Sequence, residues 1–141
     1  MKKRKVQTVI FYKMQDKTKQ FLLLQMNKRR KSFWQNATGG VDQNEKAQDA
    51  ALREAIEETG LKRSNIKKLT DAGLSFKFDD QRNNHVTEKV FFLECYQEWR
   101  VQLDPSEHQD FKWVHEKDIN QKSVHYQSNY RALVLAKEFS C

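Results

Sequence analysis

Residues 39–61 read GGVDQNEKAQDAALREAIEETGL, and this stretch predicts a short helix with three glutamates on one side. Glu54, Glu57 and Glu58 have the spacing i, i+3, i+4, so at about 100° per residue they occupy an arc of roughly 100°. The opposite side is expected to pack against the protein, and it carries mostly apolar residues: Leu52, Ala55, Ile56 and Thr59. The helix therefore has one acidic face and one packing face.

Three ionised carboxylates this close together would weaken the helix that carries them. At a separation of 4 Å and an effective dielectric constant near 20, each pair repels by about 4 kcal/mol. A divalent cation removes this conflict, and hard oxygen ligands favour Mg²⁺ or Mn²⁺, ions that also bridge to substrate phosphates. The alternative is a solvated acidic face without metal, because such faces are common on surface helices.

The wider frame of the stretch separates these two interpretations. Its fixed positions are glycines, acidic residues and one arginine at set spacings, followed by an aliphatic residue: Gly39, Glu45, Arg53, Glu54, Glu57, Glu58, Gly60 and Leu61. This pattern resembles the signature of the Nudix hydrolases at every fixed position, with Ala55 where that family usually has a larger aliphatic residue. Nudix enzymes hydrolyse a nucleoside diphosphate linked to another group, using water and usually Mg²⁺. The resemblance favours a catalytic site.

The resemblance also implies a role for individual residues. The implied metal ligands are one backbone carbonyl and three helix carboxylates: Gly39, Glu54, Glu57 and Glu58. Arg53 looks like the arginine that orients the carboxylates, and Glu54 is the expected general base. A further acidic ligand in this family often lies six residues before an aromatic that opens the last strand, and Glu107 lies six residues before Trp113. An exposed loop glutamate is the alternative for Glu107.

The residues around the helix have expected structural tasks. Gly39 and its neighbour Gly40 are expected to let the backbone turn tightly before the helix and to leave room for a phosphate or metal. Near the helix start, Asp42 and Asn44 are candidate capping residues, and Gly60 suits a left-handed C-cap. Two roles stay open for Glu45, support of the loop and metal ligation, and we prefer support of the loop.

Residues 33–39 read FWQNATG and resemble the segment before the signature in bacterial dATP pyrophosphohydrolases that also act on dihydroneopterin triphosphate. Trp34 is a candidate for stacking on a base or pterin, worth about 1–3 kcal/mol, with packing under the loop as the alternative. Arg29 or Arg30 is a candidate for charge-assisted hydrogen bonds to the phosphates, with solvated surface as the alternative. The expected substrate is a (deoxy)nucleoside triphosphate or related small triphosphate, cleaved to monophosphate and pyrophosphate.

The net charge of +7 leaves other functions open. A basic surface attracts polyanions, so the 5′ triphosphate of RNA is an alternative substrate, and dinucleoside polyphosphates are another. The basic residues are concentrated in residues 2–5 and 28–31. A third possibility is a nucleotide-binding regulator on a Nudix fold that has lost catalysis. Such a regulator is expected to lack a metal ligand, whereas all three helix glutamates are present.

The length of 141 residues predicts a single domain, residues 1–141, with one core. No apolar run approaches the roughly 18 residues of a membrane span, and no signal-peptide pattern is complete, so we expect a cytoplasmic protein without membrane contact. Cys95 and Cys141 are expected to be free thiols.

Hydrophobic patterns outside the signature predict strands and one more helix. The predicted strands are residues 6–12, 20–26, 66–78, 88–96 and 111–115. The predicted helix is residues 128–139, where apolar residues recur at helical intervals. Strands with two well-separated helices predict an α/β fold with a mixed sheet. The resemblance implies the same architecture, an α/β/α sandwich.

Overall fold

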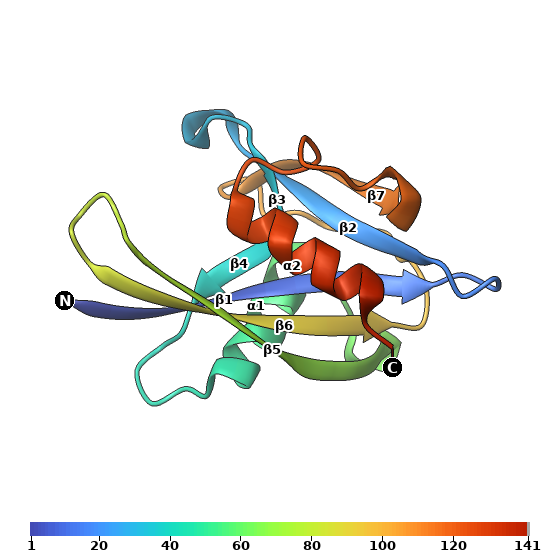
Figure 1. Ribbon diagram of the computed structural model, residues 1–141, viewed down its shortest axis with the longest axis horizontal. Coiled ribbons are helices and arrows are strands. Elements are labelled where there is room, and N and C mark those ends of the chain that lie inside the picture. Colours follow the sequence, from blue (N-terminus) through green and yellow to red (C-terminus); the bar gives the residue numbers. More distant parts are fainter. Residues whose placement is uncertain (141) are drawn as a thin grey trace.

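The computed structural model describes residues 1–140, which form seven strands and two α-helices (Figure 1). The strands are β1 (Lys2–Lys13), β2 (Lys19–Met26), β3 (Trp34–Gln35), β4 (Ala37–Gly40), β5 (Ile66–Asp79), β6 (His85–Cys95) and β7 (His108–His115). The helices are α1 (Ala47–Thr59) and α2 (Gln127–Glu138), and a short 3-10 turn spans Lys28–Arg30. The prediction for Cys141 lies outside the described residues.

Strand β1 lies at the centre of the sheet. It pairs in parallel with β6 and antiparallel with both β2 and β4, and the strand order is β3-β2-β1-β6-β5, with β7 added on β2. Residues 5–8 of β1 pair with β4, and residues 11–13 pair with β2. One parallel pairing within an otherwise antiparallel sheet confirms the predicted mixed sheet.

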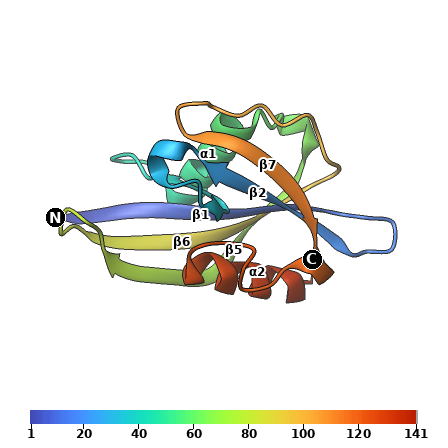
Figure 2. The same ribbon diagram turned by 90° about the horizontal axis from the view of Figure 1, so that it is seen from above.

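Helices α1 and α2 cover opposite faces of this sheet, as Figure 2 shows. Side chains alternate between the two faces along each strand. Phe21 of β2 therefore packs in one cluster with Leu133 of α2, while Leu22 packs in another cluster with Ala55 of α1. Burial on both faces explains why the middle strands have continuous apolar runs. The predicted α/β/α sandwich is confirmed.

The predicted strands and terminal helix are all present, with ends that differ by a few residues, but the short strands β3 and β4 were missed. Gly39 and Gly40 do not form a tight turn, as we had expected, since they belong to β4 and pair with Val6 and Lys5 of β1. Neither glycine has a positive φ. The tight-turn prediction was wrong because a strand this short, half of it glycine, has no hydrophobic alternation to reveal it.

The start of α1 also differs from the prediction. The N-cap residue is Lys46, without a side-chain capping hydrogen bond, so Asp42 and Asn44 are not the caps. Asn44 instead adopts a left-handed conformation (φ 68°) in the loop before the helix. The predicted C-cap is confirmed, because Gly60 has φ 70° and its N–H donates to the Ile56 carbonyl at 3.0 Å.

The packing face of α1 is made largely of small residues. Its buried residues are Ala50, Ala51, Ala55, Glu58 and Thr59. Leu52 and Ile56, which we had assigned to this face, are only half-buried. Glu58 therefore lies on the packing side of the helix, although we had placed all three glutamates on the opposite face.

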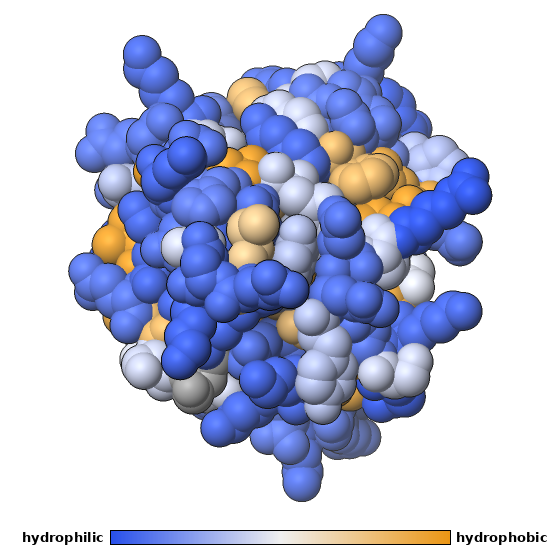
Figure 3. Space-filling model, turned by 90° about the vertical axis from the view of Figure 1, so that its right-hand side faces the viewer, coloured by the Kyte–Doolittle hydropathy of each residue, from blue (hydrophilic) through white to orange (hydrophobic). Residues whose placement is uncertain are grey.

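Hydrophilic side chains dominate the exterior seen in Figure 3, and the hydrophobic areas there are small and separate. Neither helix within residues 1–140 has the length and apolar character needed to cross a membrane.

Candidate active site

Strand β4 brings Gly39 directly against a helix glutamate. A Cβ atom added to Gly39 would lie 2.1 Å from Cδ and 2.4 Å from Cγ of Glu54. The Glu54 side chain therefore occupies the space that any other residue at position 39 would fill. The glycine is required for this close approach, and not for backbone conformation.

Arg53 holds the acidic residues around it. Its Nε and Nη2 bind the two carboxylate oxygens of Glu45 at 2.9 and 3.0 Å. Its Nη1 donates to Glu54 at 2.9 Å and to Glu57 at 3.4 Å. Nη2 also donates to the carbonyl of Gly40 at 3.0 Å. One planar guanidinium thus connects the loop, the helix and β4, the geometry in which arginine binds carboxylates best.

Glu45 supports the loop before α1. Besides the two bonds from Arg53, its Oε1 accepts a hydrogen bond from the Asp42 backbone N–H at 2.9 Å. These bonds, first of all the one from the Arg53 side chain, lower the pKa of Glu45 from 4.5 to about 2. Both carboxylate oxygens accept hydrogen bonds from Arg53 or from the loop backbone, which supports our preferred interpretation that Glu45 supports the loop.

We expect Glu45→Gln to weaken the protein most at neutral pH. A lowered pKa means that Glu45 contributes stability above pH 4.5, and that this contribution is lost as the pH falls towards about 2. Urea midpoints at pH 7 and pH 3 measure this, and the difference between variant and wild type should shrink at the lower pH. A constant difference between the two pH values would contradict the role of the charge.

One cavity of about 370 Å³ brings together the predicted ligands Gly39, Glu54, Glu58 and Glu107. Glu107 reaches it from the loop before β7, far from the helix in sequence. Two cationic side chains, Lys5 and Arg30, line the same cavity. Carboxylates and cations facing one another across a small hollow are suited to a metal ion and an anionic ligand.

Within the described part of the chain, Glu58 is the carboxylate in this cavity that has a buried oxygen atom without a hydrogen-bond partner. The residue is 7% exposed, and its Oε2 is buried without a hydrogen-bond partner within residues 1–140. Burial raises the pKa of Glu58 well above its usual range, and the charges of Glu54 and Glu107 raise it further. A buried oxygen of this kind lacks the cation or donor that normally accompanies a buried charge.

The donor set fits a hard divalent cation, because its side-chain donors are all carboxylate oxygens and one of them is orphaned. Within residues 1–140, however, no three acidic, histidine or cysteine side chains already converge as an ion cage. Glu57 is 58% exposed and bound to Arg53, and Glu107 is ion-paired with Arg30. Glu57 does not line this cavity, whereas Glu107 lines it while bound to Arg30.

Two predicted substrate residues lie outside this cavity. Arg29 is exposed in the 3-10 turn and lines neither this cavity nor the adjoining one described below. Trp34 is half-buried, packs against the core beneath α2 and is covered by Lys112, whose Nζ lies 4.2 Å from the ring centroid. This packing supports the alternative interpretation of Trp34 over base stacking. Arg30 is the predicted contact that does line the cavity.

His108 also lines the cavity, although it was not among the predicted site residues. It is 2% exposed, and neither ring nitrogen has a hydrogen-bond partner within residues 1–140. Burial lowers its pKa, so the neutral imidazole is favoured. Its position directly after Glu107 was the available signal, but a single histidine in a loop is more often a surface residue.

A second cavity of about 400 Å³ adjoins the first. Lys5, Arg30, Gln35 and Thr38 line both, so the two hollows share a wall. The second cavity extends between β5 and the start of α2 and is lined by the aromatic residues Phe76, Phe78 and Tyr126. We call it the aromatic cavity, and we call the first one the acidic cavity. The combined space has an acidic end, a cationic middle and an aromatic end.

Comparison with known proteins identifies the fold family. The model of the NUDIX domain matches residues 3–134. The crystal structure of the Escherichia coli dihydroneopterin triphosphate pyrophosphohydrolase has a TM-score of 0.79 and is 25% identical, covering 96% of this chain and 94% of that one. A C. elegans Ap4A hydrolase binary complex has a TM-score of 0.77 at 24% identity, covering 96% and 95%, and shows the likeness of fold alone.

A curated relative in sequence is the RNA pyrophosphohydrolase of Wolbachia sp. subsp. Brugia malayi (strain TRS), 27% identical over 90 residues. The match includes 57% of this chain and spans just over half, 56%, of that protein. The chain therefore belongs to the NUDIX domain family.

Proposed function

We propose that this protein is a Mg²⁺-dependent pyrophosphohydrolase that converts a (deoxy)nucleoside triphosphate, or a related small triphosphate such as that of a pterin, to the monophosphate and pyrophosphate. The observation that carries the proposal is the pair of joined cavities, in which carboxylates, cations and aromatic rings follow one another. A small triphosphate has its charges and its ring in the same order. The combined volume suits a ligand of that size.

The proposed metal ligands are Glu54, Glu57, Glu58 and Glu107, with the carbonyl of Gly39. When bound, Mg²⁺ neutralises phosphate oxygens and lowers the pKa of the attacking water. Glu54 is the proposed general base, because its side chain lies at the cavity wall and is fixed by both Arg53 and Gly39. A fixed carboxylate holds the water in line with the phosphorus, and the broken bond is the P–O bond to the leaving pyrophosphate.

Arg53 is proposed to act by positioning, since its hydrogen bonds go to carboxylates and a carbonyl within the protein. Lys5 and Arg30 are proposed to bind the phosphates, because they line both cavities. Their positive charges would offset the negative charge of the polyphosphate, and they leave the acidic end of the combined cavities open for the metal ion.

Arg30→Ala is expected to raise the KM for the triphosphate by about tenfold, because a charge-assisted hydrogen bond is worth about 1.5–3 kcal/mol. Steady-state kinetics at saturating Mg²⁺ measure the effect. Lys28→Ala is the matched control, since Lys28 is exposed in the same 3-10 turn and lines neither cavity. Equal KM values in the two variants would remove Arg30 from the phosphate site.

Product identification from a substrate panel tests the proposed function. The purified protein with Mg²⁺ is incubated with dATP, dGTP, dihydroneopterin triphosphate, dinucleoside polyphosphates and triphosphorylated RNA. Pyrophosphate released from a small triphosphate supports the proposal. Binding without turnover of any substrate would reject it in favour of a regulator, although the helix glutamates are all present.

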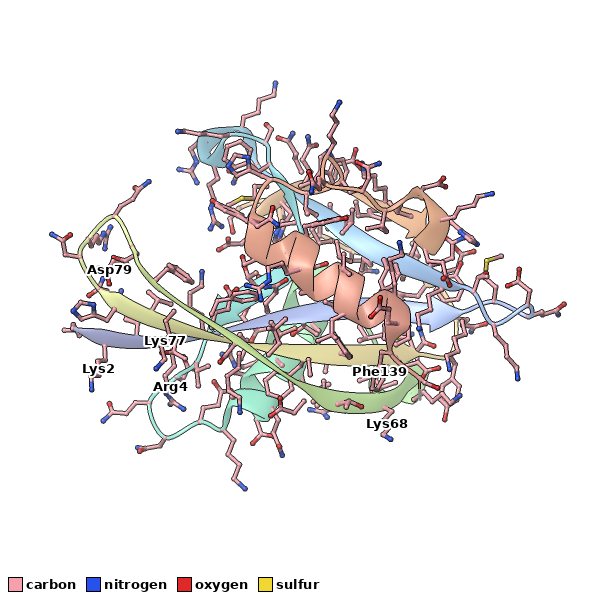
Figure 4. The ribbon with its side chains drawn as sticks, viewed as in Figure 1. Lys2, Arg4, Lys68, Lys77, Asp79 and Phe139 are labelled. Carbon is pink, nitrogen blue, oxygen red and sulfur yellow. The ribbon has the colours of Figure 1, made fainter. Side chains whose placement is uncertain are left out.

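RNA is the second candidate substrate, because basic residues extend along one end of the molecule. Figure 4 shows Lys2 and Arg4 of β1 and Lys77 of β5 towards the end where the chain begins. Lys77 also lines the aromatic cavity, so a nucleotide chain leaving that cavity would meet positive charge. Selective removal of pyrophosphate from RNA, with little turnover of free triphosphates, would favour this candidate.

A further inference from the structure

The aromatic cavity contains a buried acid that the proposed reaction does not use. Glu88, on β6, lines this cavity and is 4% exposed. Its Oε1 accepts a hydrogen bond from Gln7 Nε2 at 2.9 Å. Within residues 1–140 no hydrogen bond or ion pair involves its Oε2, and this atom is not sealed in the interior. A carboxylate oxygen in this position is available to a ligand in the cavity.

A chain of hydrogen bonds fixes Glu88 as an acceptor. Asn36 donates through its Nδ2 to Gln7 Oε1 at 2.7 Å, so the amide nitrogen of Gln7 must face Glu88 and donate to it. Asn36 is itself held by Asn129 of α2, whose Oδ1 accepts from the Asn36 backbone N–H at 2.7 Å. Three buried side chains therefore orient one carboxylate towards the cavity, at the cost of keeping polar groups inside the protein.

Among the described residues, Glu88 accepts a hydrogen bond from one protein donor, Gln7, which is few for a buried carboxylate. Burial raises its pKa, and the hydrogen bond from Gln7 and the charge of Lys5 only partly oppose this effect. Its ionised form is therefore poorly solvated. A ligand that brings N–H groups to the carboxylate supplies the missing hydrogen bonds.

The walls of the cavity suit a flat ring. Phe78 and Tyr126 both line it and are 41% and 44% exposed, an unusual degree of exposure for aromatic side chains. Phe76 adds a third aromatic wall. Aromatic faces stack on planar heterocycles of any kind, so stacking provides affinity without distinguishing one ring from another. A polar group must therefore provide the specificity for one ring.

We propose that this cavity binds the heterocycle of the substrate, and that Glu88 recognises a ring N–H next to an exocyclic amino group, the edge that guanine and pterin share. The inference rests on the proposed function and names its substrate class. A carboxylate accepts two parallel N–H donors at once, as it does from a guanidinium. In Glu88 one donor would meet the free Oε2, and the other would meet the second lone pair of Oε1, whose first lone pair accepts from Gln7. The 2-amino-4-oxopyrimidine edge presents two donors in that arrangement.

The other common rings present the wrong groups to a carboxylate. Adenine and cytosine place an acceptor nitrogen beside the amino group, and uracil and thymine place their N–H between two carbonyl oxygens. In each case an acceptor lone pair, on a ring nitrogen or on a carbonyl oxygen, faces the carboxylate, and the repulsion adds to the loss of a hydrogen bond. Selection therefore comes from repelling the wrong ring as well as from binding the right one.

Relative kcat/KM values test the inference. Wild-type protein is expected to prefer dGTP and dihydroneopterin triphosphate to dATP, and to hydrolyse dITP, which lacks the amino group, about tenfold more slowly than dGTP. Glu88→Gln keeps the size of the side chain but replaces an acceptor with a donor. It is expected to lower kcat/KM for dGTP by about 10- to 100-fold and to change dATP much less. The faster of dGTP and dihydroneopterin triphosphate shows which ring the cavity prefers.

Glu94→Gln is the matched control. Glu94 is also buried on β6, pairs with Lys67 at 3.5 Å and does not line the cavity. The dGTP to dATP ratio should equal that of the wild type in this control. An unchanged ratio in Glu88→Gln would overturn the inference while leaving the proposed hydrolase intact.

A binding measurement separates this inference from the proposed function. Calorimetry with Mg²⁺ and the α,β-methylene analogues of dGTP and dATP requires no turnover. If no triphosphate is hydrolysed but the guanine analogue binds more tightly, and Glu88→Gln removes the difference, the hydrolase proposal fails and the ring site stands. Equal binding of the two analogues by the wild type rejects the ring site.

Discussion

Glu58→Gln is expected to lower kcat by about 10²- to 10³-fold while leaving the fold intact. Glu58 contributes a buried carboxylate oxygen without a partner at the wall of the acidic cavity. An amide of the same shape retains the packing but binds a divalent cation much less well. Steady-state kinetics with a Mg²⁺ titration measure the loss, and circular dichroism reports the fold.

The same variant is expected to be more stable than the wild type when metal is chelated. At pH 8 folding of the wild type requires Glu58 either to bury its charge near Glu54 or to take up a proton, whereas the amide requires neither. Mg²⁺ should raise the Tm of the wild type more than that of the variant. Asp49→Asn is the control, because Asp49 is exposed on the first turn of α1. Near-normal turnover of Glu58→Gln would remove this residue from the site.

Gly39→Ala is expected to reduce kcat by about 10²-fold, because a misplacement of roughly 1 Å in a catalytic group has an effect of that size. The new Cβ would lie 2.1 Å from Glu54 Cδ, whereas ordinary contact begins at 3.4 Å. Glu54 must therefore retreat from the position in which Arg53 holds it. Thermal unfolding should change little, since the displaced atoms are the end of a flexible side chain.

Gly40→Ala provides the neighbouring comparison. A Cβ at Gly40 meets nothing within 4 Å, and the carbonyl that binds Arg53 is unchanged. Activity should stay close to that of the wild type, measured under the same conditions. If the two alanine variants lose activity equally, the approach of Gly39 to Glu54 is not what the site requires.

The acidic helix was predictable because its signal is local. The spacing of Glu54 and Glu58, and the glycine after the helix, lie within a single element whose periodicity is visible in the sequence. Glu107 was found only through the family resemblance, since the fold brings it to the helix from another part of the chain. Contacts of this kind depend on strand pairing that no local pattern encodes.

The aromatic cavity was not predicted at all. Its buried polar chain joins Gln7, Asn36, Glu88 and Asn129, which lie on separate elements. A signal was present in the sequence, because Gln7 interrupts an apolar strand and Glu88 precedes the apolar residues of another. Each of these polar residues, taken alone, is compatible with an exposed position. Only the strand pairing of the sheet shows that they are buried next to one another.

The central strand β1 sets the separation between the two cavities. Its residues 5–8 pair with β4, which carries Gly39, and Lys5 is also the parallel partner of Glu88 on β6. Main-chain hydrogen bonds, and not adjustable side chains, therefore determine how far the ring lies from the carboxylates. If both proposals hold, the pairing of β1 fixes the distance between the bound ring and the carboxylates. This distance would then determine which P–O bond is cleaved, whatever the length of the phosphate chain.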